Sequence, residues 1–355
     1  MSQATGLAVI RTKIDAIDQT ILDLIGQRAK CAVEAKVLKG SAKIYRPSRE
    51  TEIKTKAVAN KAALLPTNSV VAIFTEIVAA CRNLEQQLSI SYLGPAGTYS
   101  HEAAVKMFGS SSDFRPHVTL SEVLKAAQND ACDIAFLPIE NSTEGGIIET
   151  HRFLLSTDLE ISGEYTLPIK HCLISDAKSL KTITSVHAHP QALGQCREWL
   201  QLQLPHAKLI PEASNAQAAL AVRGNTHAAA IASQQASSLV GVAVLVKGIN
   251  DFPGNKTRFI ALSRFKPAAT GHDKTSIICS VKDGAGALNH LLSILAGYSI
   301  NLLRLESQPH ADHDYVFYID FQGHLDDPNV TAALAELTPA AKTCKILGSY
   351  PIATP

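Results

Sequence analysis

Residues 134–147, with the sequence IAFLPIENSTEGGI, carry the clearest structural pattern in the chain. The apolar residues 134–139 predict a buried strand, and five polar residues, 140–144, follow at once. Gly145-Gly146 then opens a predicted helix, IIETHRFLL. A strand that ends in Asn-Ser-Thr and leads into a helix start collects hydroxyls, an amide and free backbone N–H groups, which suits an anion. The lysine of a phosphate-binding loop is absent from the motif, so a carboxylate ligand fits as well as a phosphate.

The composition limits the class of protein. Of the 355 residues, 46% are hydrophobic and 18% are charged, which allows two or three domains with ample core. The formal net charge is +1, so no bulk attraction to nucleic acid or to a membrane surface is expected. The seven cysteines form no C-x-x-C pair, and neither a signal-peptide pattern nor an apolar run of about 18 residues occurs. These features predict a soluble protein of the cytoplasm.

Residues 1–88 carry a helical pattern. Apolar residues recur there at spacings of four and three, and they are Ile10, Ile14, Ile17, Ile21 and Leu24. The spacing predicts one long helix of about 30 residues, and Pro47 and Pro66 precede two further predicted helices. An all-α segment with one very long helix cannot bury its own apolar stripe, so we expect a homodimer or a larger homo-oligomer.

The rest of the chain divides into two further segments. In residues 90–266, short apolar runs such as ISYLG and RFIALS alternate with helical stretches such as SEVLKAAQND. This alternation predicts an α/β domain with largely parallel strands in two lobes. The stretch FKPAATGHDK is a predicted linker, and residues 273–355 follow the β-α-β-β-α-β order of a ferredoxin-like domain. The predicted fold is therefore multidomain, with domains at 1–88, 90–266 and 273–355.

Three basic residues of the first segment lie at positions that a solvated basic helix face does not explain. Arg28 falls on the apolar stripe, where an unpaired guanidinium is costly unless an anion meets it. Lys39 follows 11 residues later on the same helix face. Arg11 precedes Arg28 by 17 residues and lies about 100° away around the helix. It therefore points elsewhere, for example into the site of a partner subunit.

The first segment resembles the all-helical chorismate mutase family. The positions that carry the resemblance are Arg11, Arg28, Lys39, Arg49, Glu50, Cys81 and Glu85. The resemblance implies an intertwined dimer in which Arg11 reaches the partner's site, and Arg11 and Arg28 hold the two carboxylates of chorismate. It also implies that Lys39 serves the ether oxygen and Glu50 the ring hydroxyl. This pericyclic rearrangement needs the substrate to be positioned and the departing enolpyruvyl oxygen to be stabilised by cationic groups. It needs neither a nucleophile nor an acid–base pair.

Glu85 occupies a position where some members of this family have Gln. A carboxylate cannot donate a hydrogen bond to an ether oxygen, whereas a carboxylic acid can. We therefore expect Glu85 to act in its protonated form and mutase activity to favour acidic pH. A flat pH profile that Glu85→Gln leaves unaltered would contradict this expectation.

Four motifs in the middle segment belong together. Residues 94–100, GPAGTYS, lie between a predicted strand and a predicted helix, and the polar stretch Asn141-Ser142-Thr143 follows the buried strand. Residues 255–259, NKTRF, precede the apolar run FIAL, and residues 189–196 read HPQALGQC. Each motif alone is weak, since Ser and Thr at helix starts are usually caps. Together they resemble prephenate dehydratase, which implies a two-lobed α/β fold like that of periplasmic binding proteins.

The resemblance implies conversion of prephenate to phenylpyruvate with loss of carbon dioxide and water. Thr257 would donate the proton to the leaving hydroxyl, and Arg258 would raise its acidity or hold a carboxylate. The implied pocket residues are Gly97, Thr98, Asn141, Ser142 and Thr143. His189 favours a structural role at a helix start over a metal site or ligand contact, and no cofactor is expected.

The third segment resembles the ACT domain, a small amino-acid sensor. The resemblance is carried by residues 284–288, GAGAL, and residues 306–309, ESQP. It implies that L-phenylalanine binds across a dimer interface, at Gly286, Ala287, Leu288, Glu306 and Ser307. Ala285 and Gln308 replace the Pro and Arg that the family commonly shows, so the strength of feedback inhibition stays open.

A second class of protein also fits a two-lobed α/β pattern. A solute-binding or effector-binding protein fused to a dimerising helix and an amino-acid sensor would share the lobes and the polar strand ends. The Thr257-Arg258-Phe259 match favours catalysis instead. A third alternative, a single-activity enzyme whose N-terminal helices only dimerise, is disfavoured by Arg11, Arg28, Lys39 and Glu50.

Overall fold

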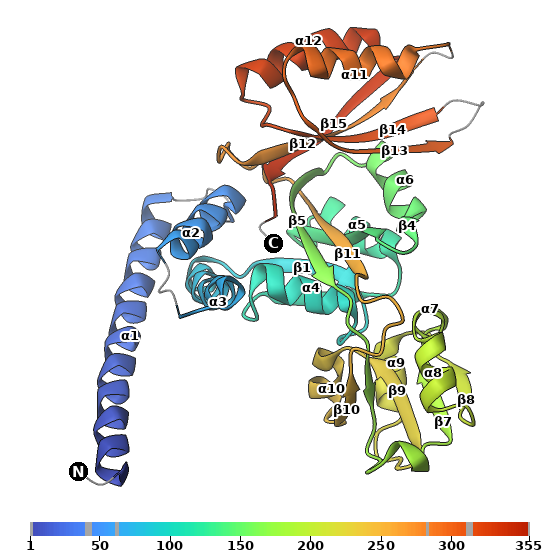
Figure 1. The fold of residues 1–355 in the computed structure, drawn as a ribbon. Helices are drawn as coiled ribbons and strands as arrows, with labels where there is room; N and C mark the ends of the chain where they lie inside the picture. Colours follow the sequence, from blue (N-terminus) through green and yellow to red (C-terminus); the bar gives the residue numbers. More distant parts are fainter. Residues whose placement is uncertain (1–2, 40–44, 61–63, 282–283, 310–314, 354–355) are drawn as a thin grey trace.

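The computed structural model describes residues 3–39, 45–60, 64–281, 284–309 and 315–353. Its N-terminal part consists of three helices, α1 (Gln3–Lys39), α2 (Pro47–Ala59) and α3 (Thr67–Glu85). They confirm the helical prediction, with Pro47 in the first turn of α2 and Pro66 directly before α3. Figure 1 shows α1 extending away from the rest of the molecule, whereas α3 contacts α4 (Tyr99–Phe108) of the next segment.

The first lobe of the middle segment is built on a sheet with the strand order β2-β1-β3-β11-β5, and β4 pairs with β3. Its strands are β1 (Ser89–Leu93), β2 (Asp113–His117), β3 (Ile134–Asn141), β4 (Gly145–Gly146), β5 (Glu160–Pro168) and β11 (Lys256–Ser263). Its helices are α4, α5 (Leu120–Gln128) and α6 (Ile148–Ser156).

The second lobe has its own sheet, with the order β10-β6-β9-β7-β8. The strands are β6 (Cys172–Ile174), β7 (Ser185–Ala188), β8 (Lys208–Pro211), β9 (Ala228–Ala232) and β10 (Val244–Lys247). The helices are η1 (Leu180–Thr182), α7 (Pro190–Gln195), α8 (Arg197–Gln203), α9 (Asn215–Ala221) and α10 (Gln234–Val240). The chain enters this lobe after β5 and leaves it before β11, so the predicted two lobes are confirmed.

The prediction of largely parallel strands is only partly correct. β1 pairs in parallel with β2 and β3, and β7 pairs in parallel with β8 and β9. However, β11 is antiparallel to both β3 and β5, and β6 is antiparallel to β9 and β10. The reason is the double crossing between the lobes. β5 ends at the junction and β11 begins there, so the two strands run in opposite directions.

The third segment has the predicted ferredoxin-like order. Its elements are β12 (Asp273–Ser280), α11 (Ala287–Gly297), β13 (Leu302–Pro309), β14 (Tyr315–Gln322), α12 (Pro328–Ala340) and β15 (Thr343–Pro351), with the sheet order β13-β14-β12-β15. One face of the sheet packs on α11 and α12. The other face contributes Ile278, Tyr318 and Leu347 to a core shared with Leu137 and Ile161 of the first lobe. The central strands β12 and β14 are thus buried on both sides, whereas the edge strand β13 stays largely exposed, and Figure 1 shows the sheet stacked on the first lobe.

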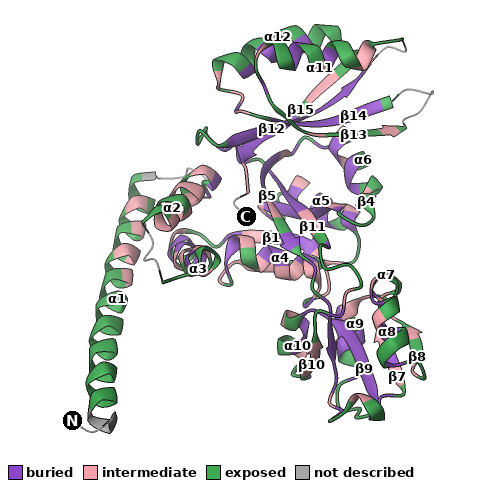
Figure 2. Cartoon of the chain, viewed as in Figure 1, coloured by how far each residue is buried: buried purple, intermediate pink, exposed green. Residues whose placement is uncertain are grey.

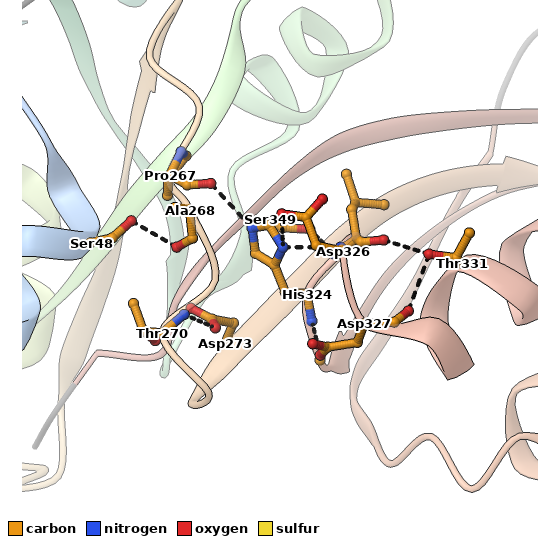
Figure 3. A network of polar contacts seen from close by, with 12 residues as sticks. Ser48, Pro267, Ala268, Thr270, Asp273, His324, Asp326, Asp327, Thr331 and Ser349 are labelled. Carbon is orange, nitrogen blue, oxygen red and sulfur yellow. Dashed lines mark hydrogen bonds and ion pairs between the residues drawn. The ribbon is translucent and has the colours of Figure 1, made fainter.

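The predicted linker is anchored at the meeting point of the three segments (Figure 3). Ser48 of α2 donates to the Ala268 carbonyl at 2.7 Å. The buried His324 Nε2 donates to the Pro267 carbonyl at 3.1 Å, since its Nδ1 accepts from a backbone N–H. Asp273 accepts from the Thr270 hydroxyl at 2.7 Å. These contacts tie the linker to the first segment through Ser48 and to the third segment through His324.

Residues 134–147 form a β-hairpin followed by a helix. β3 extends to Asn141, β4 pairs back on its end, and α6 begins only at Ile148. The expectation that Gly145-Gly146 opens the helix is wrong, because the two glycines form β4, which follows the turn at residues 142–144 and pairs with the end of β3; Gly145 has a φ of +82° there. Asn141 therefore ends a central strand, and the helix N-terminus lies elsewhere.

The apolar stripe of α1 is exposed (Figure 2). Ile10, Ile14, Ile17, Ile21 and Leu24 each keep between 47% and 58% of their surface accessible. In the described part of the chain, no helix has the length and hydropathy needed to cross a membrane. An exposed apolar stripe of this length is typical of a helix that packs against another chain.

Candidate functional sites

A cavity of about 280 Å³ lies between the three N-terminal helices. Its lining residues are Arg28, Cys31, Ala32, Ala35, Arg46, Arg49, Glu50, Ile53, Val78, Cys81, Arg82 and Glu85. The structure thus brings together five residues that were singled out from the sequence, Arg28, Arg49, Glu50, Cys81 and Glu85.

Positive charge dominates this cavity. Four arginines and two glutamates line it, so cationic side chains exceed anionic ones by two. Arg28 donates to the Ile77 carbonyl at 3.4 Å, and within the described residues neither Arg28 nor Arg46 has a carboxylate partner. The cavity therefore suits a small molecule with two negative charges.

Glu50 is held firmly in the cavity wall. Arg82 Nη1 donates to Glu50 Oε1 at 2.5 Å, and the two side chains are only 6% and 15% exposed. Lys54 follows one helical turn later, where burial lowers the pKa of its amine and the Glu50 carboxylate opposes that decrease. Glu50 is thus an oriented acceptor for a ligand hydroxyl.

Two predicted residues of the first segment are not part of this cavity as described. Arg11 lies on the exposed part of α1, about 25 Å along the helix from Arg28. Lys39 is the last residue of α1, and its side chain falls outside the described part of the structure.

The second site centres on Thr257, at the start of β11. Asn141 Nδ2 donates to Thr257 Oγ1 at 2.9 Å and to Asn255 Oδ1 at 3.0 Å. Asn141 Oδ1 in turn accepts from the backbone N–H and the hydroxyl of Thr143. Within the described residues, the Thr257 hydroxyl accepts a hydrogen bond and donates none. The arrangement orients the oxygen and leaves its proton for a ligand.

A chain of hydrogen bonds connects this site to the second lobe. Asn255 Nδ2 donates to Gln195 Oε1 at 3.0 Å, and His171 Nε2 contacts the same oxygen at 2.9 Å. Tyr99 OH lies 2.8 Å from His171 Nδ1. Burial lowers the pKa of His171, so the ring is neutral at pH 7. It then donates through Nε2 to Gln195 and accepts from Tyr99 through Nδ1.

The remaining predicted residues of the second site have structural partners. Ser142 Oγ accepts from Lys256 N at 3.0 Å and therefore pins the hairpin to β11. Thr98 caps α4 and donates to the Leu93 carbonyl. Gly97, with a φ of +91°, faces the second lobe, and a Cβ at this position would lie 3.5 Å from Ala236. His189 caps α7, which agrees with the structural role expected for it.

Arg258 is not brought together with Thr257. Its guanidinium forms a salt bridge with Glu164 at 2.7 Å. It also forms an ion pair with Asp320 Oδ2 at 2.7 Å, although that oxygen accepts no hydrogen bond within the described residues. It also donates to Tyr350 OH at 3.0 Å. Successive residues of a strand point to opposite faces, so a Thr257 that faces the site places Arg258 on the side of the third segment.

The candidate effector residues lie on two elements of the third segment. Gly286, in the left-handed conformation, precedes α11, which starts with Ala287 and Leu288. Glu306 and the exposed Ser307 lie on the edge strand β13.

Glu306 contacts the first lobe of the middle segment. It pairs with Arg304, lies 3.7 Å from His151 Nε2, and a Cβ at Gly146 would overlap its carboxylate. Arg304 also lies 3.3 Å from Glu140. Strand β13 therefore touches the hairpin that carries Asn141.

Several residues of these sites were not singled out from the sequence. They are Arg46, Arg82, His171, Gln195 and Asn255. Arg82 could have been singled out from the sequence. It follows Cys81 on the buried face of α3, where an unpaired guanidinium is costly, and the same argument singled out Arg28. Asn255 and Gln195 stand inside the two motifs NKTRF and HPQALGQC. His171 gave no pattern before the fold placed it at the lobe junction.

Three family models match three successive parts of the chain. Prephenate dehydratase matches residues 90–267, chorismate mutase type II matches residues 10–86, and the ACT domain matches residues 275–338. The chain belongs to the bifunctional chorismate mutase/prephenate dehydratase family.

Relatives in this family match over almost their whole length. The bifunctional chorismate mutase/prephenate dehydratase of Stutzerimonas stutzeri is 38% identical over 361 residues, which covers 99% of each chain. That of Aquifex aeolicus is 37% identical and covers 97% of this chain and 98% of its own. Among solved structures, the prephenate dehydratase of Arthrobacter aurescens in complex with L-Phe superposes with a TM-score of 0.69. It is 33% identical and covers 75% of this chain and 90% of its own.

Proposed function

We propose that this chain converts chorismate to prephenate in the N-terminal cavity and prephenate to phenylpyruvate at the Thr257 site. We further propose that L-phenylalanine, bound to the third segment, inhibits the enzyme. The observation that carries the proposal is the Thr257 hydroxyl, which accepts from Asn141 and keeps its proton for a substrate. The enzyme is an isomerase and a lyase at once, and it needs no cofactor.

The first reaction moves no proton. The ether C–O bond of chorismate breaks while a C–C bond forms, so the protein only has to fold the side chain over the ring and stabilise the negative oxygen. Arg28, with Arg11 of the partner subunit, holds the two carboxylates, and Lys39 serves the ether oxygen. Glu50 accepts a hydrogen bond from the ring hydroxyl. The hydrogen bond from Arg82 holds the Glu50 carboxylate in the orientation that this requires. Glu85, from α3, lines the same cavity.

The second reaction needs one proton. The bond between the ring and its carboxylate breaks, carbon dioxide leaves, and the electron pair makes the ring aromatic as the ring hydroxyl departs. Thr257 protonates that hydroxyl so that it leaves as water, and a proton from solvent restores Thr257. Asn141 orients Thr257, and the chain through Asn255 and Gln195 holds Asn141 in register with the second lobe.

Inhibition follows from the contact between β13 and the hairpin of the first lobe. The ammonium group of L-phenylalanine competes with Arg304 for the Glu306 carboxylate, and the backbone N–H groups at Gly286 bind its carboxylate. Arg304 also contacts Glu140, the neighbour of Asn141. A change at Glu306 therefore reaches the strand that orients Thr257.

The proposed two-step conversion is tested by incubating the full-length chain with chorismate alone. Phenylpyruvate, detected by its ultraviolet absorbance in alkali, is expected without added cofactor, and a second assay starting from prephenate isolates the later step. Titration with L-phenylalanine should lower the second rate. A protein that binds these compounds without turnover would instead be the two-lobed effector-binding protein considered above.

The location and assembly complete the proposal. All seven cysteines are unpaired, which fits a reducing compartment such as the cytoplasm. The exposed stripe of α1 fits a homodimer or a larger homo-oligomer. The partners are therefore small molecules and further copies of the chain.

A further inference from the structure

Arg82 connects the N-terminal cavity to the dehydratase segment. Its Nη1 donates to Glu50 inside the cavity, while its Nη2 donates to the Phe108 carbonyl at 2.6 Å and to Ser112 Oγ at 3.0 Å. The guanidinium is buried and lies 5.5 Å from the centre of the Tyr45 ring. One side chain thus binds a ligand-facing carboxylate at one end and the last residue of α4 at the other.

The surrounding contacts hold this connection in place. Glu76 of α3 accepts from the backbone N–H of Ser110 at 3.0 Å and from its hydroxyl at 2.6 Å. Gly109 packs so closely on Ala79 that a Cβ would overlap it. Ser112 also donates to the Phe108 carbonyl at 3.1 Å. The two acceptors of Arg82 in the dehydratase segment, the Ser112 hydroxyl and the Phe108 carbonyl, therefore hold each other in place. Helix α3 is therefore docked on the end of α4 with Arg82 at the centre of the contact.

We propose that Arg82 is a positioning residue of the mutase site and that the dehydratase segment completes that site through it. This inference rests on the proposed mutase function of the cavity. A free Glu50 carboxylate would rotate, or would pair with Lys54 on its own helix. Arg82 prevents both, because one arm of its planar fork binds Glu50 and the other is tied to α4. The carboxylate then faces the position of the ring hydroxyl before the substrate arrives.

The residue type matters for this role. Arginine presents donors in two directions within one rigid plane, whereas lysine has a single nitrogen at the end of a flexible chain. After Arg82→Lys, the ammonium group could reach Glu50 or the α4 carbonyl, but it could not hold both at their present separation. Arg82→Gln would remove the positive charge from both contacts.

The test compares Arg82→Gln and Arg82→Lys with the unaltered chain in full length. Arg82→Gln should reduce kcat/KM for chorismate by about 10- to 100-fold, which is typical of losing a charged hydrogen bond. The loss should fall mainly on KM, because Glu50 binds the ring hydroxyl in the substrate and in the transition state alike. Arg82→Lys should recover part of it. Dehydratase turnover of added prephenate should stay within about twofold and so report that each variant is folded.

Two further variants separate positioning from simple packing. Ser112→Ala lies outside the mutase segment, yet it should raise KM for chorismate by about 2- to 5-fold, a smaller effect than Arg82→Gln because Arg82 keeps its bond to the Phe108 carbonyl. The matched control Glu76→Ala breaks a contact in the same interface that does not reach Glu50, and it should leave KM unchanged.

A double-mutant cycle decides whether Arg82 acts through Glu50. In a Glu50→Gln background, Arg82→Gln should have little further effect on KM. An Arg82 effect of full size in that background, or an equal rise in KM with Glu76→Ala, overturns the inference. If the unaltered chain does not convert chorismate at all, the proposed function fails instead, so the two failures are distinguishable.

Discussion

Thr257 and Arg258 are neighbours in β11, yet they serve different surfaces. The Thr257 hydroxyl accepts from Asn141 at the lobe junction, whereas the Arg258 guanidinium bonds Glu164 and pairs with Asp320 beneath the third segment. The alternation of side chains along a strand separates them. Within the described residues, the Thr257 hydroxyl is therefore bonded by the neutral amide of Asn141, which in turn bonds the Asn255 amide.

Replacement of Thr257 tests this arrangement at the scale of one residue. Thr257→Ala should reduce dehydratase turnover of prephenate by about 10²- to 10⁴-fold, because the leaving hydroxyl loses its acid. Thr257→Ser keeps an O–H donor and should retain a substantial part of the rate. Chorismate consumption, measured in the same samples, should be unaffected because the N-terminal cavity lies in another segment. Equal loss of both activities would contradict separate sites.

Four strands, β5, β11, β12 and β14, meet in a buried ionic cluster. Arg258 of β11 and Lys274 of β12 pair with Glu164 of β5, and Arg258 also pairs with Asp320 of β14. Burial favours the neutral acid at Asp320, yet the charges of Arg258 and Lys274 outweigh it and hold the pKa of Asp320 below its ordinary value. The cluster therefore contributes to the docking of the third segment on the first lobe.

The stability of this docking should depend on pH. A carboxyl with a lowered folded-state pKa contributes stability above its unfolded pKa of about 3.9, and the contribution is lost as the pH falls below that value. Asp320→Asn should lower the free energy of unfolding by about 3 kcal/mol at pH 7, because it leaves a buried cation underpaired. Thermal unfolding at pH 7 and at about pH 3 measures the change, and the difference from the unaltered chain should shrink at the lower pH. Asp130→Asn, in an exposed pair with Arg264, is the control and should change little. An Asp320→Asn effect that is constant over this pH range would contradict the role of the ionised carboxyl.

At the scale of elements, local patterns predicted most helices and the number of lobes, because periodicity and turn residues act over a few neighbours. They could not predict that β11 inserts antiparallel between β3 and β5, since that pairing joins strands far apart in the sequence, with the whole second lobe between β5 and β11. The helix start expected at Gly145 failed for a local reason, because two glycines suit the returning side of a hairpin as well as a helix start. Site residues inside motifs, such as Asn141 and Thr257, could be singled out, but His171 gained its place only from the fold.

The length of α1 separates Arg11 from the N-terminal cavity of its own protomer. Arg11 lies about 25 Å along a continuous helix from Arg28, so a rigid α1 cannot bring both side chains to one cavity of the same protomer. The stripe of exposed isoleucines on the same helix provides a surface on which a second copy can pack. An antiparallel partner helix would carry its own Arg11 toward the cavity that Arg28 lines.

Mixing two inactive variants tests this assembly. Arg11→Ala and Arg28→Ala should each abolish most mutase activity as homodimers, because each site loses one carboxylate partner. A heterodimer of the two has one site with both substitutions and one site with neither. Co-expression in equal amounts, followed by a chorismate assay, should therefore restore about a quarter of the unaltered activity. Prephenate turnover is the control for concentration and folding, since neither substitution touches the Thr257 site. An absence of recovery, with heterodimers demonstrated by differently tagged subunits, would mean that each cavity works without the partner's arginine.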